Sequence, residues 1–576
     1  MKFMKYLFAL ALAFAFCANA SVSHAQSVVY LATGSSALFL ELGQAAAGLP
    51  TTGCYWTHNS DAAVAARDDR PTIPAGETDE TGKIWIAWGP GTGTCAAPVA
   101  PFDIYSEMNL DSVIGDRCFF MVNAADVGGC IQVISAAPAV LVPSLLGAGF
   151  TDTALPPNVE AAVNNQRIFV AATDIRPEDA VFASKRMFTA CGAPIARNPY
   201  LTTSYFTAGL GYQTATTGVG TPIQSATNIG VVFHVHDFNI SGNDPISGQP
   251  LAGANRSVYT VTTVGAQPVV VVVSPVPAAG TGIGAANDIS FSTLSEFLIG
   301  GYGRATDLQG PTTANPVTAF IREPLSGTYN TMEYSVPNSN EFKTSQDSRN
   351  CNGTGVLSNP MNLPSANSKV AGAKRFRAIG TGEVTGALQN AAFCTTGADC
   401  IGYFFWSAAN ASTFTATSGK YLTVNGVDPL VSSYSVTNGV LPTALNGLLP
   451  SVNFQNLNAG DYAIWSALRL VSTSPTPVGV TNLVAGVQTL SSTQNDFIPL
   501  ANLKVWKSHF NLLGLGITNN SNGMTVNPLT PGDLCSLPAS APEGGGDVGA
   551  MTISVKGNND FCTDFGAAIG INDKNQ

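Results

Sequence analysis

Short apolar runs alternate along this chain with stretches in which apolar residues recur at helical spacing. Runs of strand length lie at 28–32, 84–88, 168–172, 269–273 and 317–321. Most are followed by a turn of Gly, Ser, Thr or Asp and then by a helix-like stretch. Strands that alternate with helices in this way are typical of an α/β protein with mostly parallel strands. The pattern therefore predicts an α/β fold.

The predicted turns bring hydroxyl and backbone N–H groups to the starts of helices. Ser35 precedes an apolar helix, and Arg322 lies beside a Ser-Gly-Thr turn at 326–328 that leads into a helix expected from Tyr329. Backbone N–H groups at such starts are unpaired and carry the positive end of the helix dipole. Several of them together form an anion site, to which a guanidinium adds a bidentate donor for a tetrahedral oxyanion. A carboxylate such as Asp174 fits this site only if the ligand donates a proton to it.

Each of these features also has an interpretation without a ligand. Arg322 could be a surface arginine beside a capped helix, 89–94 a plain turn, and Asp174 an N-cap. His234 and His236 alternate in a strand-like stretch, where an exposed strand face is favoured over a metal pair because no third ligand is in sight. The tryptophans most simply fill cores.

The composition is poor in charge. Charged residues make up 11% of the 576 residues while hydrophobic residues make up 45%, against roughly a quarter charged in ordinary domains. This balance argues against a charged disordered chain and against a protein with many membrane spans. A net charge of −11 excludes nucleic acid as a partner, because no counterion release is available.

The first 25 residues predict a secretory signal peptide. Lys2 and Lys5 precede an apolar run at 6–16, and small residues allow cleavage after Ala20 or Ala25. Nothing downstream supplies 18 consecutive apolar residues. We therefore expect a periplasmic or secreted protein without a membrane span.

Ten cysteines would remain after cleavage, which in an oxidising compartment predicts disulfides. Short separations suggest Cys54 with Cys95, Cys118 with Cys130, Cys394 with Cys400, and Cys535 with Cys562, leaving Cys191 with Cys351. The sequence contains no paired C-x-x-C motif, so it does not support a zinc site.

Catalytic signatures are absent from the sequence. It contains no G-x-S-x-G or H-E-x-x-H, and no Cys/His signature. The glycine-rich turn at 89–94 matches neither a dinucleotide fingerprint nor a phosphate-binding loop of the P-loop type. Binding without chemistry and without a cofactor is the better interpretation.

Several short motifs, in this order, resemble the type-2 periplasmic solute-binding proteins, and within them the phosphate-binding proteins. They are T-G-S-S-A at 33–37, A-T-D-I-R-P-E-D-A at 172–180, V-V-V-V-V-S-P at 269–275, S-T-L-S-E-F-L-I-G-G-Y at 292–302, R-E-P-L-S-G-T at 322–328, I-G-Y at 401–403 and Y-A-I-W at 462–465. The resemblance implies a two-lobed fold that closes over one anion. Compared with the family, the chain carries insertions, including a Cys-rich stretch at 54–130, and a longer tail beyond Val471.

The resemblance also implies a domain division and a ligand set. Lobe 1 would comprise 26–235 and 460–576, lobe 2 would comprise 236–459, and crossing strands would lie near 229–275 and 455–470. The implied ligand contacts are Ser35, Ser36, Ala37, Gly91, Thr92, Gly93, Thr94, Asp174, Arg322, Ser326, Gly327 and Thr328.

Two functions follow as hypotheses. The first is an exported binding protein that captures a small oxyanion, phosphate, and delivers it to an ABC permease. The second is a secreted or surface structural protein that keeps the same scaffold without a transport role.

Overall fold

The computed structural model describes most of two long stretches of the chain and several short pieces. The described residues are 26–49, 51–58, 83–120, 144–175 without 148 and 165, 259–322 without 277–279, 326–336, 370–490 without 379, 396 and 474, and 496–503, with pieces at 63–66, 80–81, 131–134, 140, 361–363, 505–508, 518–519, 524–525 and 552–555. The predicted signal peptide, the His234 and His236 pair, and Cys130, Cys191, Cys351, Cys535 and Cys562 lie outside them.

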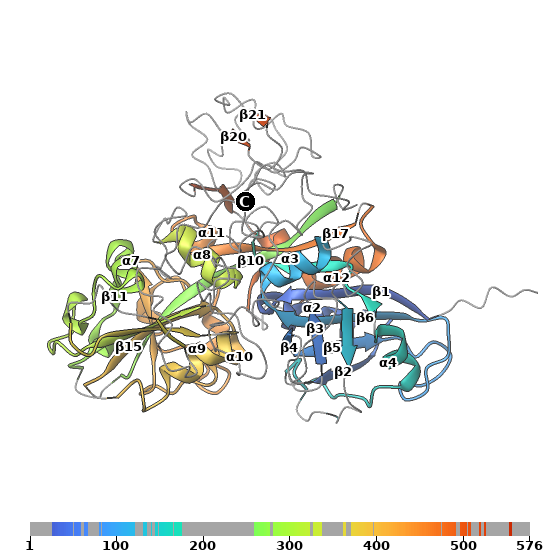
Figure 1. Cartoon of the computed structure of the whole chain (residues 1–576), viewed down its shortest axis with the longest axis horizontal. Coiled ribbons are helices and arrows are strands. Elements are labelled where there is room, and N and C mark those ends of the chain that lie inside the picture. The colour runs from blue at the N-terminus through green and yellow to red at the C-terminus, as the bar shows by residue number, and fades with distance from the viewer. Residues whose placement is uncertain are drawn as a thin grey trace, which may run out of the picture.

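One mixed sheet runs through this part of the chain (Figure 1). Its strands in spatial order are β13 (Met361–Leu363), β14 (Lys374–Ala378), β12 (Val317–Arg322), β15 (Asp399–Phe405), β10 (Tyr259–Ser274), β17 (Trp465–Thr473), β9 (Val170–Thr173), β1 (Ser27–Ser35), β6 (Asp103–Leu110), β5 (Ile84–Trp88) and β2 (Cys54–His58). Off this path are β11 (Asp288–Ile289), β16 (Lys420–Val424) and β18 (Ile498–Pro499).

Helices and small sheets complete the described fold. The helices are α2 (Ser36–Gly48), α3 (Ser112–Phe120), α4 (Pro157–Val163), α7 (Phe291–Ile299), α8 (Gly327–Ser335), α9 (Gly380–Leu388), α10 (Ala408–Ala411), α11 (Gln455–Asn458) and α12 (Val478–Gln488). The small sheets contain β3 (Ala63–Ala66), β4 (Glu80–Thr81), β7 (Ile131–Ile134), β8 (Gln166–Arg167), β19 (Val505–Ser508), β20 (Thr518–Asn519), β21 (Met524–Thr525) and β22 (Thr552–Val555). The predicted α/β class is confirmed. Within the described residues, no helix combines the length and apolar character that a membrane crossing requires.

The long strand β10 joins two groups of strands. Its first part pairs with β17, from Tyr259 opposite Thr473 to Pro268 opposite Trp465, and its last part pairs with β15 and β16. We call β2, β5, β6, β1, β9 and β17 the first strand group, and β15, β12, β14, β13, β16 and β11 the second strand group. Figure 1 shows β1, β2, β5 and β6 of the first strand group in blue and teal on the right, and the second strand group on the left. The division into two lobes that close on each other remains a prediction.

Burial explains why β10 forms where it does. Residues 269–273 are five consecutive valines, and all five are fully buried. A β-branched run buried on both faces is typical of a central strand.

The helix α7 is delimited by its own sequence. The hydroxyl of Ser290 accepts a hydrogen bond from the N–H of Thr293 at its start, and Gly300 ends the helix with a φ of 84°.

The sequence of residues 497–513 by itself predicts a helix, and the described residues of this segment do not form one. The segment forms β18, a 3-10 turn at 500–502, and β19. Ile498 pairs with Ala266 of β10, so pairing with a distant strand overrides the local pattern.

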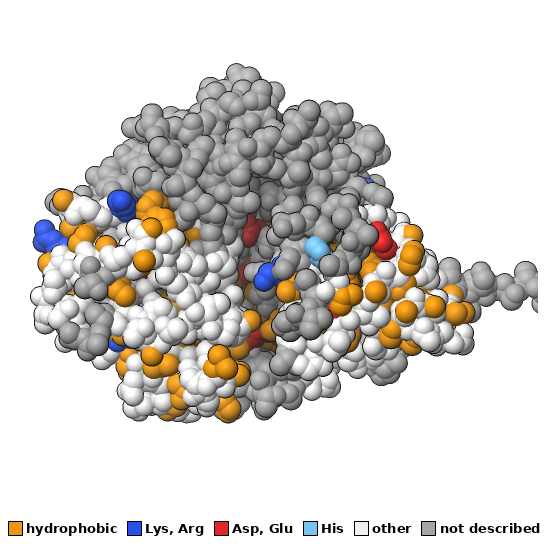
Figure 2. Space-filling model, turned by 90° about the horizontal axis from the view of Figure 1, so that it is seen from below, with side chains coloured by type: hydrophobic (Ala, Val, Ile, Leu, Met, Phe, Trp, Pro, Cys, Tyr) orange, Lys and Arg blue, Asp and Glu red, His pale blue; other side chains and the backbone are white. Residues whose placement is uncertain are grey.

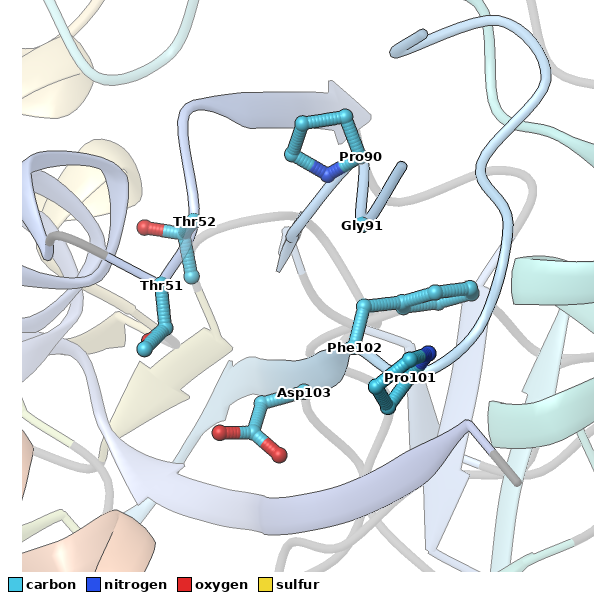
Figure 3. A pocket seen from close by; sticks show the side chains of 7 residues that line it. All are labelled: Thr51, Thr52, Pro90, Gly91, Pro101, Phe102 and Asp103. Carbon is cyan, nitrogen blue, oxygen red and sulfur yellow. The ribbon is translucent and has the colours of Figure 1, made fainter. Parts of the chain in front are cut away.

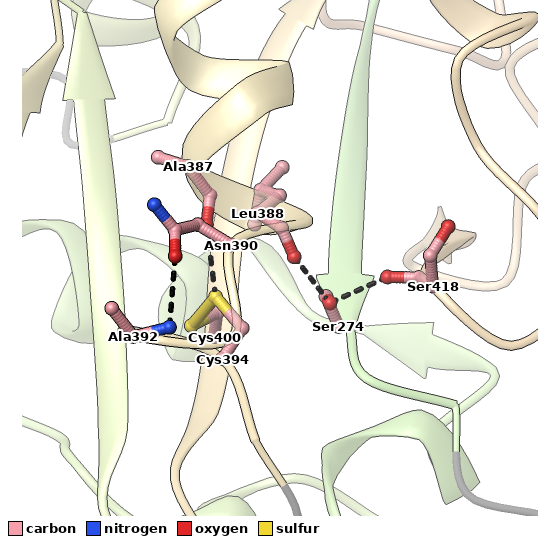
Figure 4. Close-up of a disulfide and its surroundings, with 8 residues drawn as sticks. All are labelled: Ser274, Ala387, Leu388, Asn390, Ala392, Cys394, Cys400 and Ser418. Atoms are coloured by element: carbon pink, nitrogen blue, oxygen red, sulfur yellow. Dashed lines mark hydrogen bonds between the residues drawn. A yellow bond between two sulfur atoms is a disulfide. The ribbon is translucent and has the colours of Figure 1, made fainter.

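Two predicted disulfides are confirmed. Cys54 is bonded to Cys95, and Cys394 to Cys400. The second bond ties the residues after α9 to β15, close to Ser274, whose hydroxyl donates to two backbone carbonyls (Figure 4). Cys118 is also disulfide-bonded.

Glu41, Glu107 and Asp496 form a buried acidic cluster near β10. Their exposed fractions are 2%, 0% and 3%. Asp496 accepts a hydrogen bond from the N–H of Ala408 at 2.6 Å, and its backbone carbonyl accepts one from Gln267 at 2.8 Å. The cluster therefore connects α2 and β6 with the start of α10.

Candidate functional site

Asp174 is the centre of the predicted site residues that the structure brings together. It follows β9 and is 2% exposed. The hydroxyl of Ser35 donates to its Oδ2 at 3.2 Å, and the hydroxyl of Ser112 donates to its Oδ1. Ser466 of β17 donates to the backbone carbonyl of Asp174. The carboxyl group is thus held from several elements at once.

The direction of three neighbouring strands explains this meeting. β1 runs parallel to β9 and to β6, with Gly34 opposite Ala172 and Ser35 opposite Leu110. The carboxyl ends of parallel strands lie at the same edge of a sheet, which is where ligands bind in open α/β sheets. Gly34, at a φ of 138°, allows the close packing here, since a Cβ would collide with the carbonyl oxygen of Ala172.

The start of α8 reaches the same carboxyl group from the second strand group. Ser326 caps this helix by accepting a hydrogen bond from the N–H of Tyr329 at 3.4 Å. Gly327, its first residue, lies so close to Asp174 that a Cβ would overlap Oδ1. The first turn of α8 therefore lies beside Asp174.

Gly327→Ala is expected to destabilise the folded protein by about 2 kcal/mol, because the added methyl group must displace a buried carboxyl that two serines hold. Urea unfolding of the variant measures this loss. Gly382→Ala, on α9, is the control, since no atom lies within 4 Å of a Cβ placed there. Equal stability of the two variants would contradict the close contact.

Arg322 ends β12 and is 2% exposed. Its Nη1 donates to the hydroxyl of Thr328 at 3.1 Å and to that of Thr381 at 3.0 Å. Its Nη2 lies 3.5 Å from Oδ1 of Asp111, which follows β6. The guanidinium is therefore oriented by hydroxyls of the second strand group and paired with a carboxylate of the first.

Burial raises the pKa of the Asp174 carboxyl, while hydrogen bonds from Ser112, the backbone and Ser35 and the charge of Arg322 act in the lowering direction. Both carboxyl oxygens accept hydrogen bonds from serine hydroxyls. An ionised Asp174 can also accept a hydrogen bond from a ligand that carries a hydroxyl group.

The remaining predicted residues of the first turn have different surroundings. Ser36 is exposed. The N–H of Ala37 donates to the hydroxyl of Ser35 at 3.1 Å, which caps α2. In this structure that N–H serves the helix cap.

Gly91, Thr92, Gly93 and Thr94 do not join this group. β5 runs antiparallel to β6, so the turn that follows Trp88 lies at the opposite edge of the sheet, roughly 23 Å along β1 from Ser35. Gly91 instead lines a separate pocket of about 400 Å³ with Thr51 and Asp103 (Figure 3). The sequence interpretation placed this turn at the site because the resemblance to the phosphate-binding proteins implied it.

Four residues of the group were not predicted from the sequence: Asp111, Ser112, Thr381 and Ser466. Asp111 follows β6, whose sequence D-I-Y-S-E-M-N-L mixes polar and apolar residues, and α3 begins at Ser112. No apolar run therefore marked these two residues, and Thr381 and Ser466 carry no sequence signal either.

Seen from below, the molecule has a narrow furrow between its left and right parts, with acidic side chains inside it and a Lys or Arg side chain at its rim (Figure 2). Since the net charge of the chain is −11, attraction of an anion depends on local donors such as helix starts and Arg322.

No family model matches the chain, and no curated protein matches it. Solved structures that are similar include an ancestral soluble variant of the human phosphate-binding protein, with 14% identity over 82% of this chain and 90% of that chain and a TM-score of 0.33. The periplasmic phosphate-binding protein PfluDING, bound with phosphate, has 12% identity, the same coverage and a TM-score of 0.31. An ABC-type phosphate transport receptor from Vibrio cholerae has 10% identity over 41% of this chain and 68% of that chain and a TM-score of 0.25. Since these TM-scores are below 0.5, the contacts within this chain carry the functional argument.

Proposed function

We propose that this protein binds a small tetrahedral oxyanion, phosphate, at the site around Asp174 and Arg322. The observation that carries the proposal is the meeting of three helix starts at one buried carboxyl group, with a buried guanidinium beside it. Ser35 precedes α2, Ser112 opens α3 and Gly327 opens α8, and each contacts Asp174. Helix starts supply N–H donors in fixed directions, which suits a compact anion.

The proton balance of this site supports phosphate over sulfate. Ser35 and Ser112 both donate hydrogen bonds to the carboxyl group of Asp174, which favours its ionised form. Phosphate retains a proton at neutral pH and can donate it to Asp174, whereas sulfate carries none and would meet a carboxylate with its own negative charge. A binding site discriminates strongly against a ligand that leaves one of its buried polar groups without a hydrogen-bond partner, and less strongly between ligands that differ only in size.

Calorimetric titration of the protein with phosphate and with sulfate tests this function. We expect binding heat on titration with phosphate and none on titration with sulfate. Wild-type protein that binds neither anion, or sulfate as tightly as phosphate, would contradict the proposal.

Ser112→Ala is expected to weaken phosphate binding by about tenfold, because it removes one hydrogen bond that orients Asp174. The matched control is Ser290→Ala, which removes a serine at the start of α7, where it caps a helix away from Asp174. Equal affinities of the two variants for phosphate would show that Ser112 does not serve the site.

We further propose that the protein is exported and passes its ligand to an ABC permease, as the signal-like first 25 residues suggest. The alternative of a structural surface protein on the same scaffold is not favoured by any contact described above. Recovery of the processed protein outside the cytoplasm, together with phosphate uptake that depends on it, would support the transport role.

A further inference from the structure

The ion pair between Arg322 and Asp111 crosses from one strand group to the other. Arg322 ends β12 of the second strand group, and Asp111 follows β6 of the first. Nη2 of the arginine lies 3.5 Å from Oδ1 of the aspartate, whose side chain is 11% exposed. The guanidinium that would hold an anion therefore already faces a carboxylate.

Asp111 also lies next to the other carboxyl group of the site. It immediately precedes Ser112, whose hydroxyl donates to Asp174. Two carboxyl groups, Asp111 and Asp174, thus surround one guanidinium. Among these three side chains, two can carry a negative charge and one carries a positive charge. A ligand bound here therefore lies near more acidic groups than basic groups.

We propose that Asp111 determines which protonation state of the ligand binds, an inference that rests on the proposed function of the site. A doubly protonated, singly charged oxyanion can donate one hydrogen bond to Asp174 and one to Asp111. The doubly charged form has one proton to donate, so one of its oxygens faces a carboxylate. Coulomb repulsion at such a distance in a buried site is large enough to separate the two forms.

The other titratable groups on the packed elements stay the same when Asp111 is changed. Asp116 of α3 accepts a hydrogen bond from Thr173 at 3.1 Å. Tyr403 of β15 accepts one from the backbone N–H of Arg322 at 3.3 Å, and burial, followed by the charge of Glu333 in α8, raises the pKa of Tyr403. A pH effect that disappears with Asp111 alone is therefore attributable to Asp111.

The test is calorimetric titration with inorganic phosphate, below and above the second pKa of phosphate, for the wild type and for Asp111→Asn. We expect wild-type affinity to fall as the pH rises. The variant should bind on the order of tenfold more tightly than the wild type at the higher pH and about equally at the lower pH. Asp103→Asn is the matched control, because Asp103 begins the same strand at the opposite edge of the sheet.

Other outcomes overturn the proposal. If Asp111→Asn weakens binding by the same factor at both pH values, the residue only positions Arg322. If the variant binds like the wild type at both, Asp111 has no role in selection. Wild-type protein that binds no phosphate at either pH contradicts the proposed function itself and this inference with it. Circular dichroism verifies folding, and Asp111→Ser replaces the asparagine variant if that variant does not fold.

Discussion

Replacing Arg322 by alanine is expected to lower the affinity for phosphate by at least about a hundredfold. The guanidinium can give an anion two parallel charge-assisted hydrogen bonds, each worth about 1.5 to 3 kcal/mol. Thr328 and Thr381 orient it in advance, so little entropy is lost on binding. Calorimetric titration with phosphate measures the loss.

Two further variants make this result interpretable. Arg304→Ala removes an exposed arginine from the same strand group and should leave the affinity unchanged. The double variant Arg322→Ala with Asp111→Asn avoids an unpaired buried carboxylate, which by itself destabilises a folded protein. If the double variant folds and binds phosphate as the wild type does, Arg322 is not a ligand contact.

The stability of the protein is expected to fall as the pH rises from about 5 to about 8, because of the acidic cluster. Burial raises the pKa of Glu107 to about 8 and that of Asp496 to about 6, and burial together with the charge of Asp496 raises the pKa of Glu41. The hydroxyl of Tyr30 donates to Oε2 of Glu107 at 2.9 Å, while Oε1 has no hydrogen-bond partner among the described residues. Each group therefore holds a proton more tightly in the folded state than in the unfolded chain.

The sign of the effect follows from this difference in proton binding. The contribution of Glu107 to stability is complete below its unfolded pKa, near 4.5, and is lost as the pH rises through about 8. The slope is about 1.4 kcal/mol per pH unit for one group. Glu107→Gln, which is neutral at every pH, should therefore remove up to about 4 kcal/mol of the pH dependence and stabilise the protein at high pH.

Urea unfolding of the wild type and of Glu107→Gln at several pH values measures this dependence. Glu160→Gln, a change on the half-exposed face of α4, is the matched control. A pH dependence that is the same in Glu107→Gln as in the wild type would show that this carboxyl group does not hold its proton in the folded state.

Local sequence patterns correctly predicted several of the helix caps and strands around the site. Ser35 and Ser326 cap α2 and α8, as a hydroxyl at a helix start should. The strands that precede Asp174 and Arg322 also lie close to where the apolar runs predicted them. These features depend on a few neighbouring residues, so they can be read from a short segment. Whether these residues bind a ligand remains a proposal.

The direction of a strand in the sheet could not be read in this way. The apolar run 84–88 looks the same whether its neighbours run parallel or antiparallel to it. In the folded protein it pairs antiparallel with β6, and the turn after it therefore lies far from Asp174. The same uncertainty hid Ser112, because its proximity to Asp174 depends on β6 lying beside β1.

By itself, then, the sequence predicted the α/β class, the starts of α2 and α8, and two disulfide pairs. Only the tertiary structure decided that Asp111 lies beside Arg322, that Gly327 lies against Asp174, and that Gly91 lies at the other edge of the sheet. The physical reason is that helix caps and apolar runs arise from interactions between residues close in the chain. Strand order, strand direction and the pairing of buried charges arise from contacts between residues that are far apart in it.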